Sequence, residues 1–212
     1  MTGATARIEK VVTAGTFTLD GGEWQVENNV WLVGDDREVL VVDAAHDAEQ
    51  ILAAVGDRRV VAVVCTHGHN DHVNAAVEVA AAADAEIALH PADQVLWAQE
   101  YDDLVPDLEL GEGAAFEVAG TRLAVLHTPG HSPGSVSLYA ESLGAVFSGD
   151  TLFAGGPGAT GRSYSDFGQI IASIRDRLLT LPADTVVHTG HGEDTVIGRE
   201  APHLPEWVAR GH

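Results

Sequence analysis

The sequence predicts a mixed α and β protein with one domain over residues 1–212, and three observations carry this prediction. Residues 1–45 are rich in β-branched and alternating runs, which are typical of strands. The remainder alternates short apolar runs with helical segments, an order found in layered α and β folds. No linker, charge block or low-complexity tract marks a domain boundary. The apolar fraction of 45% is sufficient for a well-formed core.

The first half of the chain is expected to begin with strands and then to alternate. Asp-Gly-Gly and Gly-Asp-Asp turns separate three strand-like runs, at residues 7–19, 25–33 and 39–43. A short helix at residues 47–55 precedes a continuous apolar run at residues 60–65, which is typical of a buried strand. An Ala-rich helix at residues 72–83 and a strand at residues 86–90 follow. A further helix is expected from Pro91, because proline suits a first helical turn.

The second half repeats this pattern without a visible sequence repeat. Strands are expected at residues 115–118, 122–127, 135–139, 145–148 and 185–189. Helices are expected at residues 167–179 and 200–210.

The composition restricts the partners that the protein can have. Its 11 Lys and Arg residues face 32 Asp and Glu residues, a net charge of −21, so nucleic-acid binding is not expected. No window approaches 18 consecutive apolar residues, so no membrane span is expected. The first ten residues contain no apolar signal region, and Cys65 is the only cysteine. These features together predict a cytoplasmic protein; oligomeric state has no signal in the sequence.

Seven side chains of the types that bind divalent metals follow four of the predicted strands. They are His67, His69, Asp71 and His72 in THGHNDHVN, His131 in TPGHSPGS, Asp150 in FSGDT, and His191 in TGHGED. Each segment lies just after the carboxyl end of a strand, where loops of α/β proteins converge on ligands.

Imidazole nitrogens and carboxylate oxygens are ligands for zinc and similar ions. Seven such groups exceed the needs of one tetrahedral ion but suit two ions with a bridging carboxylate. Zinc can lower the pKa of bound water from about 15.7 to about 7, which supplies hydroxide near neutral pH. The sequence therefore predicts a metal-dependent hydrolase.

These motifs resemble those of the metallo-β-lactamase superfamily over nearly the whole chain. The resemblance implies an α+β fold, an αββα sandwich of two mixed β-sheets with helices on both outer faces. It also implies a role for each matching residue. The first ion would be held by His67, His69 and His131; the second ion would be held by Asp71, His72 and His191, with Asp150 bridging. Asp71 and Asp150 would be the catalytic carboxylates.

Asp43, at the end of VLVVDAA, matches an aspartate of that superfamily that orients a ligand from behind. Capping of the following turn is the alternative role for Asp43, and the sequence does not decide between them.

Within the superfamily, GDTLFAGG and HTGHGEDTVIGRE resemble the small glyoxalase II-like (hydroxyacylglutathione hydrolase-like) group. That resemblance implies hydrolysis of a thioester of a small thiol. Too few residues follow His191 for the separate helical region that grips glutathione in full-length members, so glutathione, mycothiol and bacillithiol are all candidate carriers. Arg162, Tyr164 and His46 are the candidate substrate contacts.

Other functions stay open at this point. A persulfide dioxygenase of the same superfamily would use one iron on His67, His131 and Asp150, a two-His-one-carboxylate set. A lactonase or other esterase would use the same centre without releasing a thiol. Antibiotic hydrolysis is disfavoured, because true metallo-β-lactamases generally lack the bridging aspartate and are exported. Zinc is the expected metal, with iron and manganese as alternatives.

The remaining histidines, the cysteine and the tryptophans are interpreted as structural. Cys65 is expected to be buried and inert. Five histidines are expected to be solvated or hydrogen-bonded: His90, His127, His188, His203 and His212. The tryptophans are expected to be core or packing residues rather than a ligand cage: Trp24, Trp31, Trp97 and Trp207.

Overall fold

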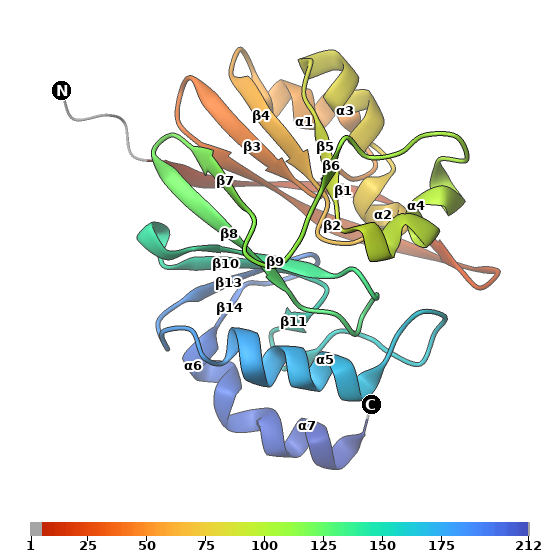
Figure 1. The fold of residues 1–212 in the computed structure, drawn as a ribbon, viewed down its shortest axis with the longest axis vertical. Helices are drawn as coiled ribbons and strands as arrows, with labels where there is room; N and C mark the ends of the chain where they lie inside the picture. The colour runs from red at the N-terminus through yellow and green to blue at the C-terminus, as the bar shows by residue number, and fades with distance from the viewer. Residues whose placement is uncertain (1–5, 212) are drawn as a thin grey trace.

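Two six-stranded β-sheets lie face to face in the computed structural model, which describes residues 6–211, and helices cover both outer faces (Figure 1). The αββα sandwich expected from the sequence is therefore confirmed. His212 lies outside the described residues.

The first sheet has the strand order β1-β2-β3-β4-β5-β6. Its strands are β1 Arg7–Leu19, β2 Gly22–Gly34, β3 Glu38–Val42, β4 Arg59–Val64, β5 Ile87–Leu89 and β6 Leu108–Glu109. The first three pair antiparallel, and β3 to β6 pair parallel. The long β1–β2 hairpin turns at Asp20 and Gly21, whose φ angles of 52° and 76° suit a tight hairpin turn.

The second sheet has the order β14-β13-β10-β9-β8-β7. Its strands are β7 Ala115–Val118, β8 Thr121–His127, β9 Val136–Ala140, β10 Ala145–Gly149, β13 Val186–Thr189 and β14 Thr195–Val196. Only β10 and β13 pair parallel within this sheet; the other pairs are antiparallel. A separate two-stranded ribbon, β11 Leu152–Phe153 with β12 Gly156–Pro157, follows β10.

The helices are short and divide between the two outer faces (Figure 1). They are α1 Ala48–Val55, α2 Asn70–Val73, α3 Ala76–Ala83, α4 Gln94–Glu100, α5 Phe167–Ser173, α6 Ile197–Glu200 and α7 Leu204–Arg210. The single helix expected at residues 72–83 is wrong, because it divides into α2 and α3. Between them the backbone N–H of Ala75 donates to the carbonyl of Ala44, outside the helix, at 3.1 Å.

Two other predicted helices are also less regular than the sequence suggests. The helix expected at residues 167–179 consists of α5 followed by a π-helical turn at Ile174–Leu178. The closing helix consists of α6, a 3₁₀ turn at Ala201–His203, and α7, with prolines in the first turns of the last two.

Alternating side chains along the central strands build the layers. On β2, Val30 and Leu32 face the helices of the first sheet, whereas Trp31 and Val33 face the second sheet. Trp31 packs edge-on against Phe147 of β10, with ring centroids 5.9 Å apart. Successive side chains face opposite layers, and both layers are buried. Such a strand is therefore a nearly continuous apolar run in the sequence.

Backbone hydrogen bonds join the two sheets at one edge. The N–H of Val136, at the start of β9, donates to the carbonyl of Thr66, just after β4, at 2.8 Å. The N–H of Asn29 on β2 donates to the carbonyl of Gly190, just after β13, at 2.8 Å. The loops that follow β4, β8, β10 and β13 meet at this edge.

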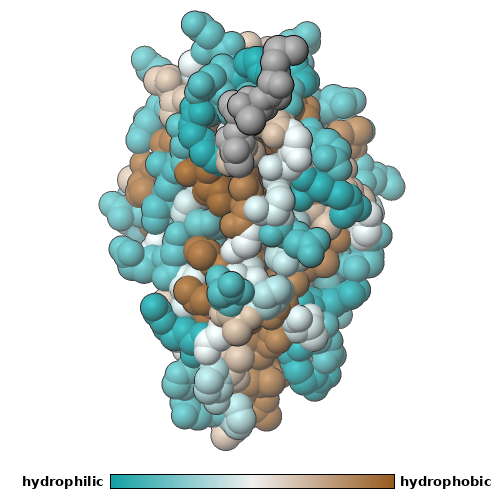
Figure 2. Space-filling model, turned by 90° about the vertical axis from the view of Figure 1, so that its left-hand side faces the viewer, coloured by the Kyte–Doolittle hydropathy of each residue, from teal (hydrophilic) through white to brown (hydrophobic). Residues whose placement is uncertain are grey.

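One side of the molecule is largely polar. Figure 2 shows one side, on which hydrophilic residues cover most of the area and apolar residues appear mainly along a vertical band. Within residues 6–211, no helix is both long and apolar enough to span a bilayer.

Candidate metal centre

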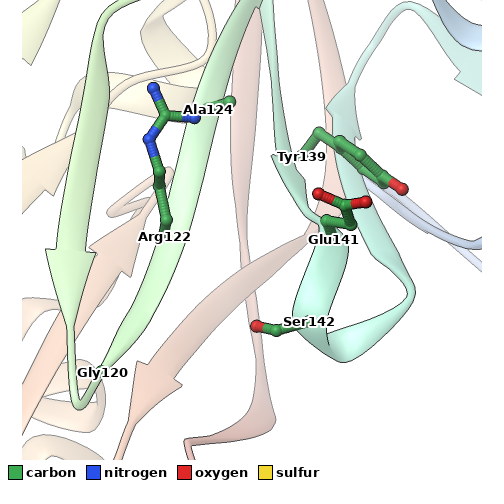
Figure 3. Close-up of a pocket in the computed structure, with 6 residues that line it drawn as sticks. All are labelled: Gly120, Arg122, Ala124, Tyr139, Glu141 and Ser142. Carbon is green, nitrogen blue, oxygen red and sulfur yellow. The ribbon is translucent and has the colours of Figure 1, made fainter.

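One cavity lies on the second sheet. It is lined by Gly120, Arg122, Ala124, Tyr139, Glu141 and Ser142 (Figure 3). None of the seven candidate metal ligands lines it. It lies beside the start of β8 and the end of β9, at the opposite end of these strands from the loop that carries His131. The seven candidate metal ligands therefore lie at another place in the molecule.

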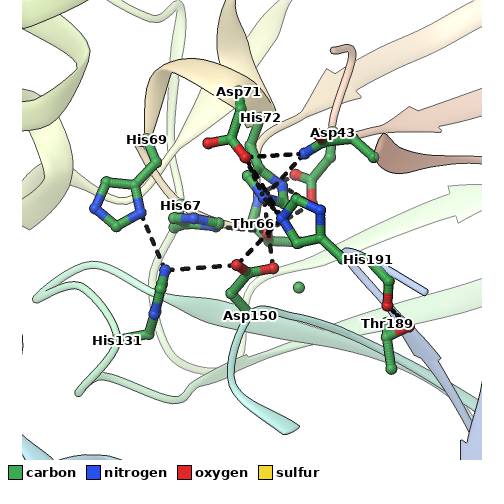
Figure 4. A network of polar contacts seen from close by, with 12 residues as sticks. Asp43, Thr66, His67, His69, Asp71, His72, His131, Asp150, Thr189 and His191 are labelled. Atoms are coloured by element: carbon green, nitrogen blue, oxygen red, sulfur yellow. Dashed lines mark hydrogen bonds and ion pairs between the residues drawn. The ribbon is translucent and has the colours of Figure 1, made fainter. Parts of the chain in front are cut away.

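All seven candidate ligands converge at the edge where the two sheets are joined (Figure 4). His67, His69, Asp71, His72 and His131 are buried, while Asp150 and His191 are partly buried. The two sheets contribute unequally, because the four residues after β4 belong to the first sheet and the other three to the second. The site is therefore assembled across the sandwich.

One group of ligands is His67, His69 and His131. The Nδ1 of His69 lies 3.0 Å from the Nε2 of His131. The Nε2 of His67 is buried and has no hydrogen-bond partner in the described structure. The Nε2 of His69 also has none, but it lies on the side of the ring turned away from His131 (Figure 4). A buried polar nitrogen without a partner is costly unless a ligand satisfies it.

The second group is Asp71, His72 and His191. The Nε2 atoms of His72 and His191 lie 3.2 Å apart. The Oδ2 of Asp71 lies 3.4 Å from the Nε2 of His191 and 3.7 Å from that of His72.

Asp150 lies between the two groups. Its Oδ2 is 3.6 Å from the Nε2 of His131 in the first group and 3.4 Å from the Nε2 of His191 in the second. Its Oδ1 is 3.4 Å from the Nε2 of His72 and has no hydrogen-bond partner in the described structure. The position of Asp150 is the one that a bridging carboxylate requires.

These distances fit metal binding. Ligand atoms about 2.0–2.1 Å from a tetrahedral ion lie about 3.3 Å apart. The ligand atoms described above lie between 3.0 and 3.7 Å apart. The residues present, their separation, the unpartnered Nε2 of His67 and the unpartnered Oδ1 of Asp150 therefore suit two divalent ions.

Hydrogen bonds behind the histidines hold the rings so that one nitrogen of each faces the centre. The Nδ1 of His131 donates to the carbonyl of Ala159 at 2.9 Å, and the Nδ1 of His191 donates to the carbonyl of Glu27 at 2.7 Å. Each bond leaves the Nε2 lone pair of that ring free to bind an ion.

Asp43 orients two of the ligands, and it also holds the turn after β4. Its Oδ2 accepts from the Nδ1 of His72 at 3.0 Å and from the Oγ1 of Thr66 at 2.8 Å. Since the Thr66 hydroxyl donates to Asp43, it accepts from the Nδ1 of His67, 3.1 Å away. The Oδ1 of Asp43 accepts from the backbone N–H of Thr66 at 2.7 Å. Of the two roles that the sequence left open, these contacts match the orientation of candidate ligands; within residues 6–211 the carboxylate bonds to the turn after β4 and not to the turn that follows Asp43.

The acid–base properties of the histidines differ between the two groups. Burial lowers the pKa of His67 well below its usual range and that of His69 to about 3. Burial also disfavours charge on His72 and His191, but neighbouring carboxylates, Asp150 first among them, outweigh it. They raise the pKa of His72 to about 9 and that of His191 to about 11.

Asn28 is a neighbour of the centre that the sequence analysis missed. Its side-chain N–H donates to the Oδ2 of Asp71 at 3.2 Å, and its Oδ1 accepts from the Nε2 of His46 at 2.9 Å. The Nδ1 of His46 accepts from the side chain of Asn74 at 3.0 Å. His46, expected as a substrate contact, thus lies one residue behind the candidate ligands. Nothing in the pattern of β2 distinguishes Asn28 from an ordinary buried strand residue.

Arg162 and Tyr164 lie on the loop that follows β12. The guanidinium of Arg162 stacks on the ring of Trp24, 4.0 Å from its centroid, and Tyr164 is exposed. Trp24 is 37% exposed and is therefore a packing residue outside the core. It lies on the β1–β2 hairpin beside Phe17, which contacts His69 edge-on. Arg162 and Trp24 therefore flank the His69 side of the centre.

The structure agrees with the structural roles expected for Cys65, His188 and the other three tryptophans. Cys65 is fully buried, and Trp31, Trp97 and Trp207 lie in the core. His188 is buried against Trp31, and its ring bonds to the carboxylate of Asp194 at 2.8 Å.

Known proteins with similar sequences and structures share this architecture. The family model of the metallo-beta-lactamase superfamily matches residues 24–191. The chain is 32% identical over 195 residues to the hydroxyacylglutathione hydrolase GloC of Haemophilus influenzae, covering 84% of this chain and 92% of that one.

Two solved structures are similar to this chain in both sequence and fold. The structure of TTHA1623 in a di-iron-bound form is 34% identical, with a TM-score of 0.74 and coverage of 83% of this chain and 93% of that one. The structure of the BLEG-1 B3 metallo-beta-lactamase is 28% identical, with a TM-score of 0.76 and coverage of 92% and 100%. With the fold, the converging ligands and these matches, the chain belongs to the metallo-β-lactamase superfamily.

Proposed function

We propose that this protein is a zinc-dependent hydrolase that cleaves the thioester of a small thiol, in the manner of hydroxyacylglutathione hydrolases. The observation that carries the proposal is Asp150, whose two oxygens face both groups of histidines. Similarity to GloC over most of both chains supports the thioester as substrate class. Two ions held by the seven residues would lower the pKa of water and polarise a carbonyl oxygen.

The protein's own groups prepare the centre for this chemistry. Asp43, the Ala159 carbonyl and the Glu27 carbonyl each hold one Nδ1 proton, so the opposite nitrogens present lone pairs in fixed directions. The burial of His67 and His69 keeps these rings neutral, as ligands must be. No serine or cysteine nucleophile is needed, and a thiolate leaves without a strong general acid.

The surface beside His69, formed by Arg162 and Trp24, suits the thiol-carrier part of the substrate. Arg162 has no carboxylate within 4.0 Å in the part of the chain that the structure describes, and Trp24 holds its guanidinium flat. An arginine held in this way can pair with a carboxylate of the thiol carrier. We place Arg162 and Tyr164 as carrier contacts and His46 as a support for Asn28.

β-Lactam hydrolysis is a second candidate, because the BLEG-1 structure described as a B3 metallo-beta-lactamase covers nearly the whole chain at 28% identity. An iron-dependent oxygenase is a third, because the di-iron form of TTHA1623 connects this fold with iron. Both candidates use the same centre, so substrate and metal must be tested together.

The experiment measures free-thiol release from lactoyl and formyl thioesters of glutathione, mycothiol and bacillithiol, with protein loaded with zinc or with iron. Thiol release that a chelator abolishes and zinc restores supports the proposal. Hydrolysis of a chromogenic β-lactam, or oxygen uptake with a persulfide and iron-loaded protein, without thiol release from any thioester, would contradict it.

A further inference from the structure

Asp93 is a buried carboxylate that the proposed chemistry does not use. It lies in the 3₁₀ turn Pro91–Asp93 between β5 and α4, and its exposed fraction is 0%. Burial raises the pKa of its carboxyl group, and hydrogen bonds from Ser132, Gly68 and Gly134 oppose this shift. No positively charged side chain forms an ion pair with it in residues 6–211.

Its hydrogen bonds all come from the two loops that carry one group of candidate ligands. The Oδ2 of Asp93 accepts from the backbone N–H of Gly68, between His67 and His69, at 2.8 Å. The same oxygen accepts from the hydroxyl of Ser132, the residue after His131, at 2.6 Å. The Oδ1 accepts from the backbone N–H of Gly134 at 2.5 Å. One carboxylate therefore ties the loop after β4 to the loop after β8.

The two glycines make this close approach possible. A Cβ at Gly134 would lie 2.7 Å from the Cγ of Asp93, and a Cβ at Gly68 would lie 2.8 Å from its carbonyl oxygen. Real Cβ atoms do not approach backbone and carboxyl atoms so closely, so any other residue would displace Asp93. The glycines in THGHND and SPGS thus serve the same contact.

We propose that Asp93 is a positioning residue for the metal centre: it clamps the His67–His69 loop to the His131 loop, so that these three imidazoles are held close enough to share one ion. The clamp acts through backbone amides rather than through the ligands themselves. The backbone bond from Val136 to Thr66 joins the same two segments, and Asp93 adds the contacts made beside the histidines themselves. Without these contacts the loops would be less well fixed, and the entropy of ordering them would weaken binding.

The test uses Asp93→Asn, which keeps the shape but replaces one acceptor oxygen with an N–H donor. We expect zinc affinity, measured by competition with a chromophoric chelator, to fall about tenfold, at the lower end of the loss seen when partners behind metal ligands are removed. Hydrogen–deuterium exchange in the metal-free variant should be faster in residues 66–72 and 129–136.

Asp35→Asn is the matched control. Asp35 is also fully buried and also accepts two backbone N–H bonds, from Arg37 at 2.8 Å and Glu38 at 3.0 Å. It lies at the opposite end of β3 from Asp43 and far from the ligands along that strand. We expect this variant to lose stability but to keep wild-type zinc affinity.

Gly134→Ala supplies a second route to the same contact if Asp93→Asn does not fold. It should also weaken zinc binding, whereas Gly111→Ala, where an added Cβ meets nothing within 4 Å, should not. Zinc affinity within twofold of wild type in folded Asp93→Asn or Gly134→Ala, or an equal loss in Asp35→Asn, would overturn the proposal. No substrate enters this measurement, so failure of the thioesterase proposal would leave it interpretable.

Discussion

At the scale of single residues, a second hydrogen bond holds four of the five candidate imidazoles, and His69 is the exception. His72 depends on Asp43, His131 on a backbone carbonyl and His67 on Thr66. Asp150 has a different task, since it has contacts in both ligand groups. These roles lead to different expected losses when the residues are changed.

Removal of Asp150 should uncouple the two ions. We expect Asp150→Ala to bind one ion fewer per chain and to lose at least about 100-fold in turnover, since even outer partners of metal ligands contribute 10- to 100-fold. Metal content by atomic emission and turnover of the preferred thioester check this. Near-normal metal content together with near-normal turnover would refute the bridging assignment.

Zinc binding should depend on pH at one group of ligands and hardly at the other. With pKa values of about 9 for His72 and about 11 for His191, this group binds protons at pH 7 in the metal-free protein, and these protons must leave when an ion binds there. Affinity for that ion should therefore rise with pH between 6 and 8, about tenfold per pH unit for each proton released.

His67 and His69 are already neutral in this range, because burial lowers the pKa of each below 6.5. The ion that they share with His131 should show a shallower pH dependence. Zinc titrations with a competing chelator at pH 6, 7 and 8, corrected for the chelator's own protonation, measure both slopes. Equal slopes for the two ions would contradict the assignment.

At the scale of secondary-structure elements, the ligand loops are held by the helices behind them as well as by the strands before them. The loop after β8 lies against α5, where the N–H of Asp166 donates to the carbonyl of Gly130 at 2.7 Å. Gly130 has a φ of 135°, and a Cβ there would lie 2.2 Å from the backbone nitrogen of Ile170. Only glycine suits both the conformation and the contact.

Gly130→Ala should therefore push the His131 loop away from α5. We expect a loss of about 3 kcal/mol in the free energy of unfolding, because backbone strain and a steric overlap add at this position. Urea unfolding of the metal-free protein measures the loss. Gly111→Ala serves as the control, and an effect of the two variants equal within about 0.5 kcal/mol would show that the contact is not tight.

At the scale of the whole molecule, charge is the unusual property. A net charge of −21 on 212 residues produces self-repulsion in the folded state, and hydrophilic residues dominate the side shown in Figure 2. Most of the basic side chains already form ion pairs with neighbouring carboxylates, so the excess negative charge has few internal partners.

Salt should therefore stabilise the protein. Raising sodium chloride from about 10 mM to about 500 mM shortens the screening length to below about 5 Å and should raise the Tm by several degrees. Differential scanning fluorimetry of the metal-free protein measures the shift, and sucrose at equal osmolarity controls for solvent effects. A Tm that falls or stays constant with salt would show that repulsion is not a significant cost.

Much of the fold and of the centre could be predicted from the sequence. The strand boundaries followed from β-branched runs, and the ligand set followed from histidines and aspartates placed after strand ends. Irregular helices were less predictable: the break between α2 and α3 depends on a hydrogen bond from Ala75 to Ala44, which has no local signature. The packing of Trp24 against Arg162 could not be predicted, because the two residues are distant in the sequence.

The sequence by itself determined which side chains can bind a metal, because ligand chemistry belongs to the residue type and strand ends are marked by local patterns. Only the tertiary structure decided how those side chains are held. Asn28, Thr66 and Asp93 act through contacts between segments distant in the chain. Two histidines depend on the backbone carbonyls of Glu27 and Ala159. Every residue has a backbone carbonyl, so only its position in the folded chain gives it this role.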